Sequence, residues 1–349
     1  MKILHLDTQK GFRGGEQQLI YLAEGLRELG IDSIIAAKDE LYKKAGAMGF
    51  ETIDSSNLKQ LLGAAKQCDI LHAHASKAHT LGVFLKLLTR KPLVYTRRVD
   101  YKQKKISKLK YLLTDKVVCV SNFVKQILYA NYRLDSDVIY DAVDHGLIHK
   151  VDAQKVSKIK KQYGPLIIGN IGALTAQKDH KTLIDAASQL DKSYTFLILG
   201  EGNLKQELEI YAKQKGVNNI VFLGFRDDIQ NYLAAFDLFV ISSQNEGICS
   251  SILQAFLFKI PVVATNAGGV SELIGDNQRG LLVPIKDSQA LAQNIENLIQ
   301  NKKISEDLSD QAYQFSIHFS LNSIANQYKL IYEQIIITIV SIFLLVNFS

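Results

Sequence analysis

Three loops of this sequence combine glycine, a charged side chain and the start of a helix, and this combination suits an anionic ligand. The first loop, GFRGGEQQ from Gly11 to Gln18, follows an apolar run at the start of the chain. Glycine lets a ligand approach the backbone, and the first turn of a helix offers N–H groups to an anion. The spacing is not GxGxxG, so the dinucleotide fingerprint is absent, and a tight structural turn explains the loop equally well.

The second loop is GNIGALTAQKDH, from Gly169 to His180, and it follows another apolar run. Lys178 lies six residues after Gly172 and just before a helix expected to begin near His180. An ammonium group in that place can neutralise a diphosphate. The loop is not a P-loop because the GKS/T ending is missing, and a solvent-exposed lysine is the alternative interpretation.

The third loop, SSQNEGICSSILQAF from Ser242 to Phe256, is the most specific of the three. Glu246 follows the strand-like run DLFVIS, and the next helix begins within the same loop, so its positive end points into the same space. The residues whose amides and hydroxyls a ligand can use here are Gly247, Ile248, Cys249, Ser250 and Ser251.

Two other features could indicate different chemistry. His72 and His74 form an HxH pair, with which some metal-dependent hydrolases begin, but no cluster of carboxylates and histidines with matching spacing follows. We therefore expect no metal site, and we expect His72 to be packed or hydrogen-bonded in its strand. Nothing near Cys249 in the sequence lowers the pKa of its thiol, so we expect a small packing residue rather than a nucleophile.

The elements that must position these loops follow one rhythm along the chain. Short β-branched runs alternate with amphipathic stretches, which is typical of a parallel sheet covered by helices. The rhythm occurs twice, on either side of a less regular stretch from Asp141 to about Lys161. The sequence therefore predicts two doubly wound α/β domains, and a ligand in the cleft between them, beyond the carboxyl ends of the strands.

Length and composition agree with this prediction. A chain of 349 residues corresponds to roughly two domains of about 150 residues each. Three cysteines without a CxxC pair cannot build a disulfide framework or a thiolate metal cluster, which favours a reducing, cytoplasmic setting. The opening MKILHLD is strand-like, so we expect no secretion signal.

Nine pieces of the sequence, in their order, resemble the retaining glycosyltransferases of family 4, whose GT-B fold has two facing Rossmann-like domains and a C-terminal crossover helix. The pieces are GGEQQLIYLAEGL, DILHAHASKAH, VVCVSNFVKQIL, IYDAVD, IGALTAQKDH, LGEGNLKQELE, VFLGFRDDI, EGICSSILQA and PVVATNAGGVSELI. The resemblance covers roughly residues 1–334. It implies an acceptor-side domain over residues 1–150 completed by a helix over 320–334, a donor domain over 151–319, and a short apolar tail over 335–349.

The resemblance also implies roles for individual residues. Glu246 matches the first glutamate of the family's EX7E element, which holds the hydroxyls of the donor sugar. Lys178 matches the lysine that stabilises the departing nucleoside diphosphate, and His74 matches a histidine that faces the reacting end of the donor. The remaining donor-binding positions are Gly14, Gly15, Gly172, Glu201, Gly202, Phe225, Arg226, Gly247, Ile248, Cys249, Ser250, Ser251 and Gln254.

Two positions depart from the family pattern. Gln254 stands where the second glutamate of EX7E is expected, and Ala173 stands where an arginine usually follows Gly172. A carboxylate accepts from both ribose hydroxyls, whereas an amide has one acceptor oxygen. The lost charge-assisted bond costs about 1 to 2 kcal/mol, or roughly tenfold in affinity. A non-catalytic GT-B-like protein that binds a nucleotide sugar or a glycan, or a nucleotide-sugar epimerase, is therefore the alternative.

The resemblance implies transfer of a sugar, with retention, from a nucleotide-diphosphate sugar to a glycolipid or polysaccharide precursor. Synthesis of lipopolysaccharide or another cell-surface glycan is the expected setting, with no metal and no other cofactor. The basic surplus lies in residues 1–150, with 24 Lys and Arg against 16 Asp and Glu. Its densest part, RRVDYKQKKISKLK over 97–110, suits the anionic inner face of the cytoplasmic membrane better than nucleic acid, which we do not expect as a partner. A solvated helical face explains this charge run about as well.

The last feature is the apolar run IIITIVSIFLLV, from Ile335 to Val346. Its 12 residues are fewer than the roughly 20 that a membrane-spanning helix needs. Three interpretations stay open: the run docks on the protein, it dips into one leaflet of a membrane, or it is an altered C-terminus without function.

Overall fold

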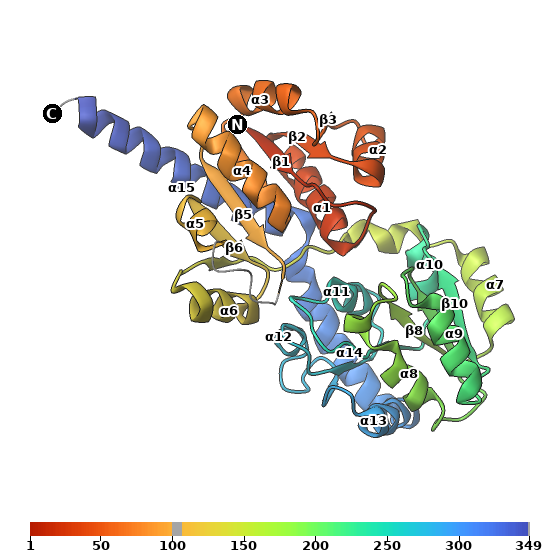
Figure 1. Cartoon of the computed structure of the whole chain (residues 1–349). Coiled ribbons are helices and arrows are strands. Elements are labelled where there is room, and N and C mark those ends of the chain that lie inside the picture. Colours follow the sequence, from red (N-terminus) through yellow and green to blue (C-terminus); the bar gives the residue numbers. More distant parts are fainter. Residues whose placement is uncertain (100–106, 348–349) are drawn as a thin grey trace. The chain divides into compact units, whose positions relative to one another are not determined.

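The computed structural model describes residues 1–99 and 107–347, with the backbone alone for residues 107 and 342–347. The chain divides into two compact units, and each unit is built on its own parallel sheet (Figure 1). The first unit consists of Met1–Ala142 and Phe319–Ser349, and the second of Val143–His318. The predicted α/β class with two doubly wound sheets is confirmed.

The first unit has a seven-stranded sheet in the order β3-β2-β1-β4-β5-β6-β7. Its strands are β1 (Lys2–Leu6), β2 (Asp32–Ala37), β3 (Glu51–Asp54), β4 (Ile70–Ala73), β5 (Leu93–Arg97), β6 (Lys116–Cys119) and β7 (Asp137–Val138). Its helices are α1 (Gly14–Glu28), α2 (Asp39–Ala47), α3 (Leu58–Gln67), α4 (Ser76–Thr89), α5 (Ser107–Leu112), α6 (Asn122–Tyr132) and, from the end of the chain, α15 (Leu321–Asn347).

The second unit has a six-stranded sheet in the order β10-β9-β8-β11-β12-β13. Its strands are β8 (Ile167–Ile171), β9 (Thr195–Leu199), β10 (Ile220–Gly224), β11 (Leu238–Ile241), β12 (Val262–Thr265) and β13 (Leu281–Val283). Its α-helices are α7 (Ala153–Tyr163), α8 (His180–Ala187), α9 (Lys205–Gln214), α10 (Ile229–Leu233), α11 (Ser250–Leu257), α12 (Val270–Ile274), α13 (Ser288–Gln300) and α14 (Lys302–Ser316). Short 3₁₀ turns are η1 (His145–Lys150), η2 (Ala176–Lys178) and η3 (Ile317–Phe319).

Each sheet reverses its strand order once. In the first sheet the reversal lies between β1 and β4, and in the second between β8 and β11. The loops that follow the two strands on either side of a reversal leave the sheet in opposite directions, so a crevice opens between these loops. Ligands of open α/β sheets bind in this crevice. The second and third predicted loops follow β8 and β11, so the topology brings these two loops together.

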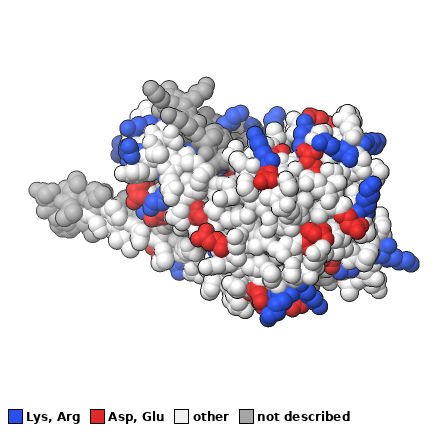
Figure 2. Space-filling view, turned by 90° about the horizontal axis from the view of Figure 1, so that it is seen from below, with Lys and Arg blue, Asp and Glu red and all other residues white. Residues whose placement is uncertain are grey.

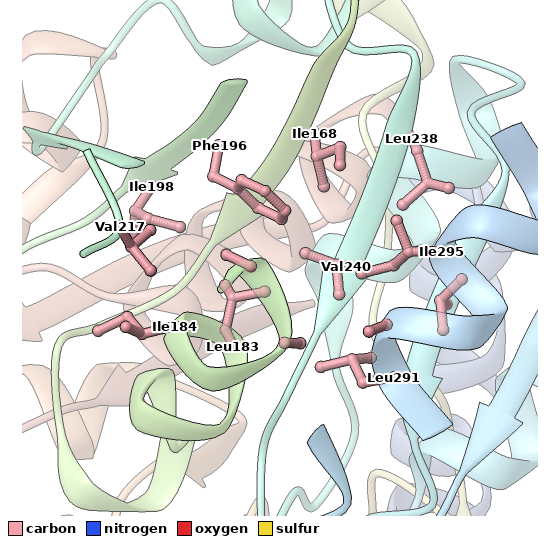
Figure 3. Close-up of a cluster of buried hydrophobic side chains, with 14 of the residues drawn as sticks. Ile168, Leu183, Ile184, Phe196, Ile198, Val217, Leu238, Val240, Leu291 and Ile295 are labelled. Atoms are coloured by element: carbon pink, nitrogen blue, oxygen red, sulfur yellow. The ribbon is translucent and has the colours of Figure 1, made fainter. Parts of the chain in front are cut away.

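The core of the second unit lies between its sheet and the helices that cover it (Figure 3). Buried side chains of β8, β9 and β11 face those of α8 and α13. The labelled members of this cluster are Ile168, Leu183, Ile184, Phe196, Ile198, Val217, Leu238, Val240, Leu291 and Ile295. Strands covered on both faces read as continuous apolar runs, which is why the sequence shows them clearly.

The structure adds elements that the sequence pattern did not indicate. The stretch expected to be irregular up to about Lys161 contains helix α7, so that expectation was wrong there. Asp152 caps α7 by accepting hydrogen bonds from the amides of Gln154 and Lys155, but the helix is mostly polar and buries only Ile159, so few apolar residues mark it in the sequence. Helices α2 and α3 and the short strands β3 and β7 were missed as well.

Helix α15 packs along α1 in the first unit, although the two helices come from opposite ends of the chain. Ser320 precedes α15 and accepts a hydrogen bond from the amide of Ser323, as expected of an N-cap. Gly25 of α1 makes the close approach possible, because a Cβ there would lie 2.5 Å from the carbonyl oxygen of Leu321 and 2.7 Å from Cβ of Ala325. The helix does not end near Gln334 but continues to Asn347.

Gly25→Ala tests how tightly α15 must pack. We expect the substitution to lower the free energy of unfolding by about 1 to 3 kcal/mol, because the added methyl group overpacks the α1–α15 contact. Gly63→Ala on α3 is the matched control, since a Cβ there meets no atom within 4 Å. The control should gain about 0.5 to 1 kcal/mol from helix propensity alone. Urea unfolding measures both, and an equal gain in the two variants would contradict the close contact.

Candidate active site

An ion pair joins the second and third predicted loops at the switch point of the second sheet. Lys178 ends the turn η2 after β8, and Glu246 lies in the loop after β11. The Nζ atom of Lys178 donates to Oε1 of Glu246 over 2.6 Å, with the Glu246 side chain 6% exposed and the Lys178 side chain 23% exposed. The two residues with predicted catalytic roles in this unit are therefore in direct contact.

Backbone and amide hydrogen bonds hold the two loops in register. The amide of Gln244 donates to the carbonyl of Gln177 over 2.8 Å, and the Gln177 side chain donates to the carbonyl of Asn245 over 2.6 Å. The hydroxyl of Ser242 donates to the carbonyl of Lys178 over 3.0 Å. Because these bonds connect the two loops on both sides of the ion pair, the lysine and the carboxylate are positioned by the backbone rather than by each other alone.

Ser243 is a site residue that the sequence analysis missed. Its hydroxyl donates to Oε1 of Glu246 over 2.6 Å, and its own carbonyl accepts from the hydroxyl of Thr265 on β12 over 2.6 Å. The same carboxylate oxygen thus accepts from both Ser243 and Lys178. The only signal in the sequence was a serine three residues before Glu246, which has no meaning until the turn brings the two side chains together.

The loops after β8 and β9 also meet backbone to backbone. The amide of Gly172 donates to the carbonyl of Leu199, and the amide of Leu174 donates to that of Glu201, both over 2.9 Å. Gly200 has a φ of +144°, and a Cβ on it would lie 2.0 Å from the carbonyl oxygen of Gly172, so this approach requires glycine.

Four of the predicted donor-binding residues, Glu201, Gly202, Phe225 and Arg226, form a second small group at this edge. Oε1 of Glu201 accepts from the amide of Phe225 over 3.4 Å. Phe225 is 46% exposed, and the guanidinium of Arg226 lies 5.8 Å from the ring centre of Tyr232. The neighbouring Gly202 passes so close to Leu174 that a Cβ would lie 2.2 Å from its carbonyl oxygen.

Helix α11 begins at Ser250, directly after the Glu246 loop, as predicted. Cys249 is buried with its Sγ atom 3.3 Å from the hydroxyl of Ser251, and burial raises the pKa of its thiol to about 11. A thiol that stays protonated does not act as a nucleophile at neutral pH, which agrees with the packing role expected for it. Gln254 is half-buried on the same helix.

The remaining predicted residues, His74, Gly14 and Gly15, lie in the first unit. Gly14 and Gly15 form the first turn of α1, where Glu16 accepts from the amide of Arg13 over 2.8 Å. His74 follows β4 and is 5% exposed. Its Nε2 atom shares a hydrogen bond of 3.0 Å with Nδ1 of His5 from β1, so His74 lies at the switch point of the first sheet.

His5, His72 and His74 form a buried group whose ligand atoms lie within 4.8 Å of one another, a spacing that fits a shared metal ion. Both ring nitrogens of His72 are already engaged, with the hydroxyl of Tyr332 at 2.7 Å and that of Thr96 at 2.8 Å. The second nitrogen of His5 lies 3.2 Å from the hydroxyl of Ser33. A metal would have to displace these bonds, and the expectation that His72 is hydrogen-bonded in its strand is confirmed.

Charged residues around His74 form a group that the sequence analysis did not single out. Arg98 follows β5 and makes an ion pair with the buried Asp141. Asp7 follows β1, is 3% exposed and accepts from the amide of Gln9 over 2.6 Å. Burial raises the pKa of Asp7 to about 6 against the opposing effect of that hydrogen bond. Each lies just past a strand or in a connecting segment, so only the fold gathers them.

Two family descriptions match this chain and together span most of it. The description "Glycosyltransferase Family 4" matches residues 12–147, and "Glycosyl transferases group 1" matches residues 152–315. The chain belongs to the group 1 glycosyltransferases. This glycosyltransferase has the GT-B fold, and the resemblance inferred from the sequence is confirmed.

Curated relatives of the glycosyltransferase include enzymes of bacterial surface glycans. The lipopolysaccharide core biosynthesis glycosyltransferase LpsE of Rhizobium meliloti is 25% identical over 94% of this chain and 98% of its own length. An uncharacterized glycosyltransferase of Methanocaldococcus jannaschii is 26% identical over 65% of this chain, and the match spans 62% of that protein.

Solved structures give the same fold over nearly the whole chain. A glycosyltransferase from Rickettsia africae has a TM-score of 0.84 and 26% identity, covering 96% of this chain and 98% of that one. Anabaena HepE in complex with UDP and glucose has a TM-score of 0.85 and 24% identity, covering 95% and 99%. Within the described residues, no helix combines the length and apolar character needed to cross a membrane.

The buried histidines predict acid sensitivity. Burial lowers the pKa of His5 to about 3, that of His180 to about 4, and those of His72 and His74 well below 6.5. Below about pH 6.5 the unfolded chain therefore binds protons that the folded chain does not, so stability is lost as the pH falls. We expect the free energy of unfolding to fall by more than about 2 kcal/mol from about pH 7 to about pH 5, measured by urea unfolding.

Asp7 affects the pH dependence of stability in the opposite direction. Because its pKa is raised, ionisation of the buried carboxyl lowers the free energy of unfolding above about pH 6, and this cost disappears as the pH falls. Asp7→Asn should therefore increase the free energy of unfolding by about 1 to 3 kcal/mol near pH 8 and make the acid loss steeper. Asp32→Asn, at an exposed position at the start of β2, is the matched control and should change little. If the free energy of unfolding varies with pH in the same way for Asp7→Asn and the unchanged protein, ionised Asp7 does not lower the stability.

Proposed function

We propose that this chain transfers a sugar from a nucleoside diphosphate sugar to a lipid-linked glycan or polysaccharide precursor, with retention at the anomeric carbon. The observation that carries the proposal is the Lys178–Glu246 pair at the switch point of the second sheet, next to the start of α11. A cation and a helix N-terminus beside a buried carboxylate suit a ligand that has both a diphosphate and sugar hydroxyls.

A uridine diphosphate sugar is the donor that the similar proteins support best. Anabaena HepE has been solved with UDP and glucose and with UDP-glucose, and one curated relative from Escherichia coli is named as a UDP-Gal galactosyltransferase. In this chain Glu201, Gly202, Phe225 and Arg226 would bind the nucleoside, since they lie at the same edge of the sheet as Lys178. Gln254 on α11 would meet the ribose as an amide rather than a carboxylate.

The mechanism follows from where charge develops. As the bond between C1 of the sugar and the diphosphate oxygen breaks, the sugar gains oxocarbenium character and the diphosphate gains negative charge. Lys178 and the first turn of α11 would stabilise that charge, and Glu246 would hold the sugar hydroxyls. Binding of the donor exchanges the contact between Lys178 and Glu246 for contacts of each with the ligand, while Ser243 keeps the carboxylate in place. We propose that no metal and no cofactor takes part.

The acceptor is proposed to bind to the first unit, in the setting of lipopolysaccharide or another surface glycan. Relatives from Campylobacter jejuni and Escherichia coli are named for acceptors linked to diphosphoundecaprenol, and LpsE is named for the lipopolysaccharide core. A lipid-linked acceptor of this kind supports our proposal that the reaction takes place at the cytoplasmic face of the membrane. His74 would face the reacting end of the donor, with Asp7 and Arg98 as polar neighbours at the same sheet edge.

A non-catalytic protein that binds nucleotide sugars is the second candidate, and Gln254 and Ala173 favour it. Both residues remove a charge that the family pattern places near the nucleotide. A binding protein would retain the donor without releasing a nucleoside diphosphate, whereas an epimerase would change the sugar without transferring it. Product analysis with UDP-, GDP- and ADP-sugars separates these outcomes from transfer.

Glu246→Gln and Lys178→Met test the proposed site. We expect each variant to reduce sugar transfer at least about a hundredfold, because one removes the carboxylate that holds the sugar and the other removes the cation at the leaving group. The measurement is release of nucleoside diphosphate together with formation of glycosylated product.

Lys181→Met is the matched control, since Lys181 lies on the neighbouring helix α8 with its side chain 47% exposed and paired with Glu207. Its transfer rate should not change. Thermal unfolding shows whether each variant is folded. Transfer at the unchanged rate in both site variants would disprove the assignment of the site.

The basic segment over residues 97–110 predicts salt-dependent binding to anionic lipid. Lys108 is exposed at the start of α5, whereas Lys102, Lys104 and Lys105 lie outside the described residues. Replacing these four lysines by glutamine should weaken binding to vesicles that contain phosphatidylglycerol, because each basic residue contributes about 1 kcal/mol near an anionic surface. Replacing four exposed lysines of the second unit, Lys158, Lys161, Lys192 and Lys213, should not. Equal losses in both variants would show that total charge, rather than this segment, drives binding.

A further inference from the structure

The C-terminal part of α15 is a helix without a partner in the described chain. The first part of α15 is buried in the first unit, where Tyr328 is 3% exposed and Tyr332 is fully buried. Beyond Gln334 the helix projects away from the rest of the first unit (Figures 1 and 2). Figure 2 shows no Lys, Arg, Asp or Glu on the described part of this projection. The interpretation in which the run docks on the protein is therefore wrong for residues 337–341.

The projecting helix is exposed on every side. The five consecutive residues over 337–341 are all exposed, with Ile337 at 64%, Ile339 at 43% and Val340 at 52%. Successive residues of a helix are about 100° apart, so five in a row cover the whole circumference. No charged residue occurs from Gln334 to the end of the sequence. An apolar helix with no polar face belongs in an apolar medium rather than in water.

We propose that residues 335–347 of α15 insert into one leaflet of a lipid bilayer and anchor the first unit to it. These residues form about 20 Å of helix, whereas half of the hydrocarbon core is about 15 Å thick. A helix of this length reaches through one leaflet. The proposal goes beyond the proposed function, because it requires no sugar transfer.

A bilayer fits this helix better than a second copy of the chain. Pairing with one other helix covers a stripe along one side and leaves the remaining apolar residues in water. Lipid covers all sides at once, as the exposure of Ile337, Ile339 and Val340 requires. The threonine of the segment does not oppose insertion, since the Thr338 hydroxyl donates to the carbonyl of Gln334 over 2.8 Å.

A second surface of the first unit also suits a lipid headgroup layer. It lies on α4 and α5, and α4 covers the opposite face of the sheet from α15, because Tyr95 of β5 stacks on His79 of α4 whereas the next residue, Thr96, bonds Tyr328 of α15. The Nζ atom of Lys110 on α5 donates to the Thr80 hydroxyl on α4 over 3.1 Å, so the two helices pack together. Exposed residues on and directly after these helices include Lys77, Phe84, Leu87, Leu88, Arg90, Lys108, Leu109 and Leu112. Apolar side chains among cations favour the interface of an anionic membrane.

The test compares two matched double variants of the full-length chain. Ile337→Glu with Ile339→Glu places charge on the projecting helix, and Ile210→Glu with Ile304→Glu places the same charge on similarly exposed isoleucines, which are 58% and 42% exposed. We expect the first variant to bind phosphatidylcholine vesicles at least about a hundredfold more weakly, and the second to bind as the unchanged protein does. Flotation with vesicles of neutral lipid measures this, and it separates insertion of α15 from the charge-dependent binding of residues 97–110.

A tryptophan reports on depth directly, because the chain has none. The emission of the Val340→Trp variant should shift to the blue on mixing with vesicles and be quenched by brominated lipid acyl chains, whereas that of Ile304→Trp should do neither. Circular dichroism and a sugar-transfer assay in detergent show that the variants are folded and separate loss of anchoring from failure of the proposed function.

Three results overturn the proposal. The first is equal vesicle binding by the two double glutamate variants, and the second is an emission of the Val340→Trp variant that vesicles leave unchanged. The third is a dimer in solution, in the absence of vesicles, that the Ile337→Glu and Ile339→Glu substitutions convert to a monomer. That result would favour a second copy of the chain as the partner of the helix.

Discussion

Glu246 carries a charge that the second unit buries almost completely, and the geometry of the site depends on how that charge is balanced. A buried carboxylate without a partner is costly, so the loop that holds it has to bring a cation and a hydroxyl to it. Lys178 and Ser243 meet this need from opposite sides of the switch point, and the backbone bonds around Gln177 lock the two loops together. The start of α11 and the glycines after β8 and β9 are held in place as a result.

The first unit meets the same constraint in another way. Its switch point buries three histidines, and burial keeps them neutral instead of pairing them with carboxylates. The hydroxyls of Tyr332 and Tyr328, both from α15, reach His72 and Thr96. Helix α15 is therefore an integral part of the first unit, because removing it would take away the partner of Nδ1 of the buried His72. The close contact at Gly25 serves this same arrangement.

The proposed membrane insertion of α15 is consistent with the proposed transfer of sugar to a lipid-linked acceptor. An enzyme whose acceptor is linked to a lipid gains from being held at the membrane, since both substrates are then presented to it from fixed directions. The buried half of α15 completes the first unit and the projecting half would reach the lipid, so one continuous helix would couple the acceptor-side sheet to the leaflet. Gln254 and Ala173 would leave Lys178 and the start of α11 with a larger share of the diphosphate charge.

The sequence alone determined the class of fold, the family and the loops of the donor side, because buried parallel strands read as apolar runs and the loop residues keep their spacing. The apolar pattern did not reveal α7, α2 or α3, each of which buries no more than three side chains. Nor could it find Ser243, Asp7 or Arg98, since each becomes a site residue only when strands distant in sequence lie side by side. Three interpretations of the apolar run were equally consistent with its composition, and only the tertiary structure decided against docking on the protein. The reason is that burial depends on which surfaces the fold leaves nearby, and the fold places none beside residues 337–341.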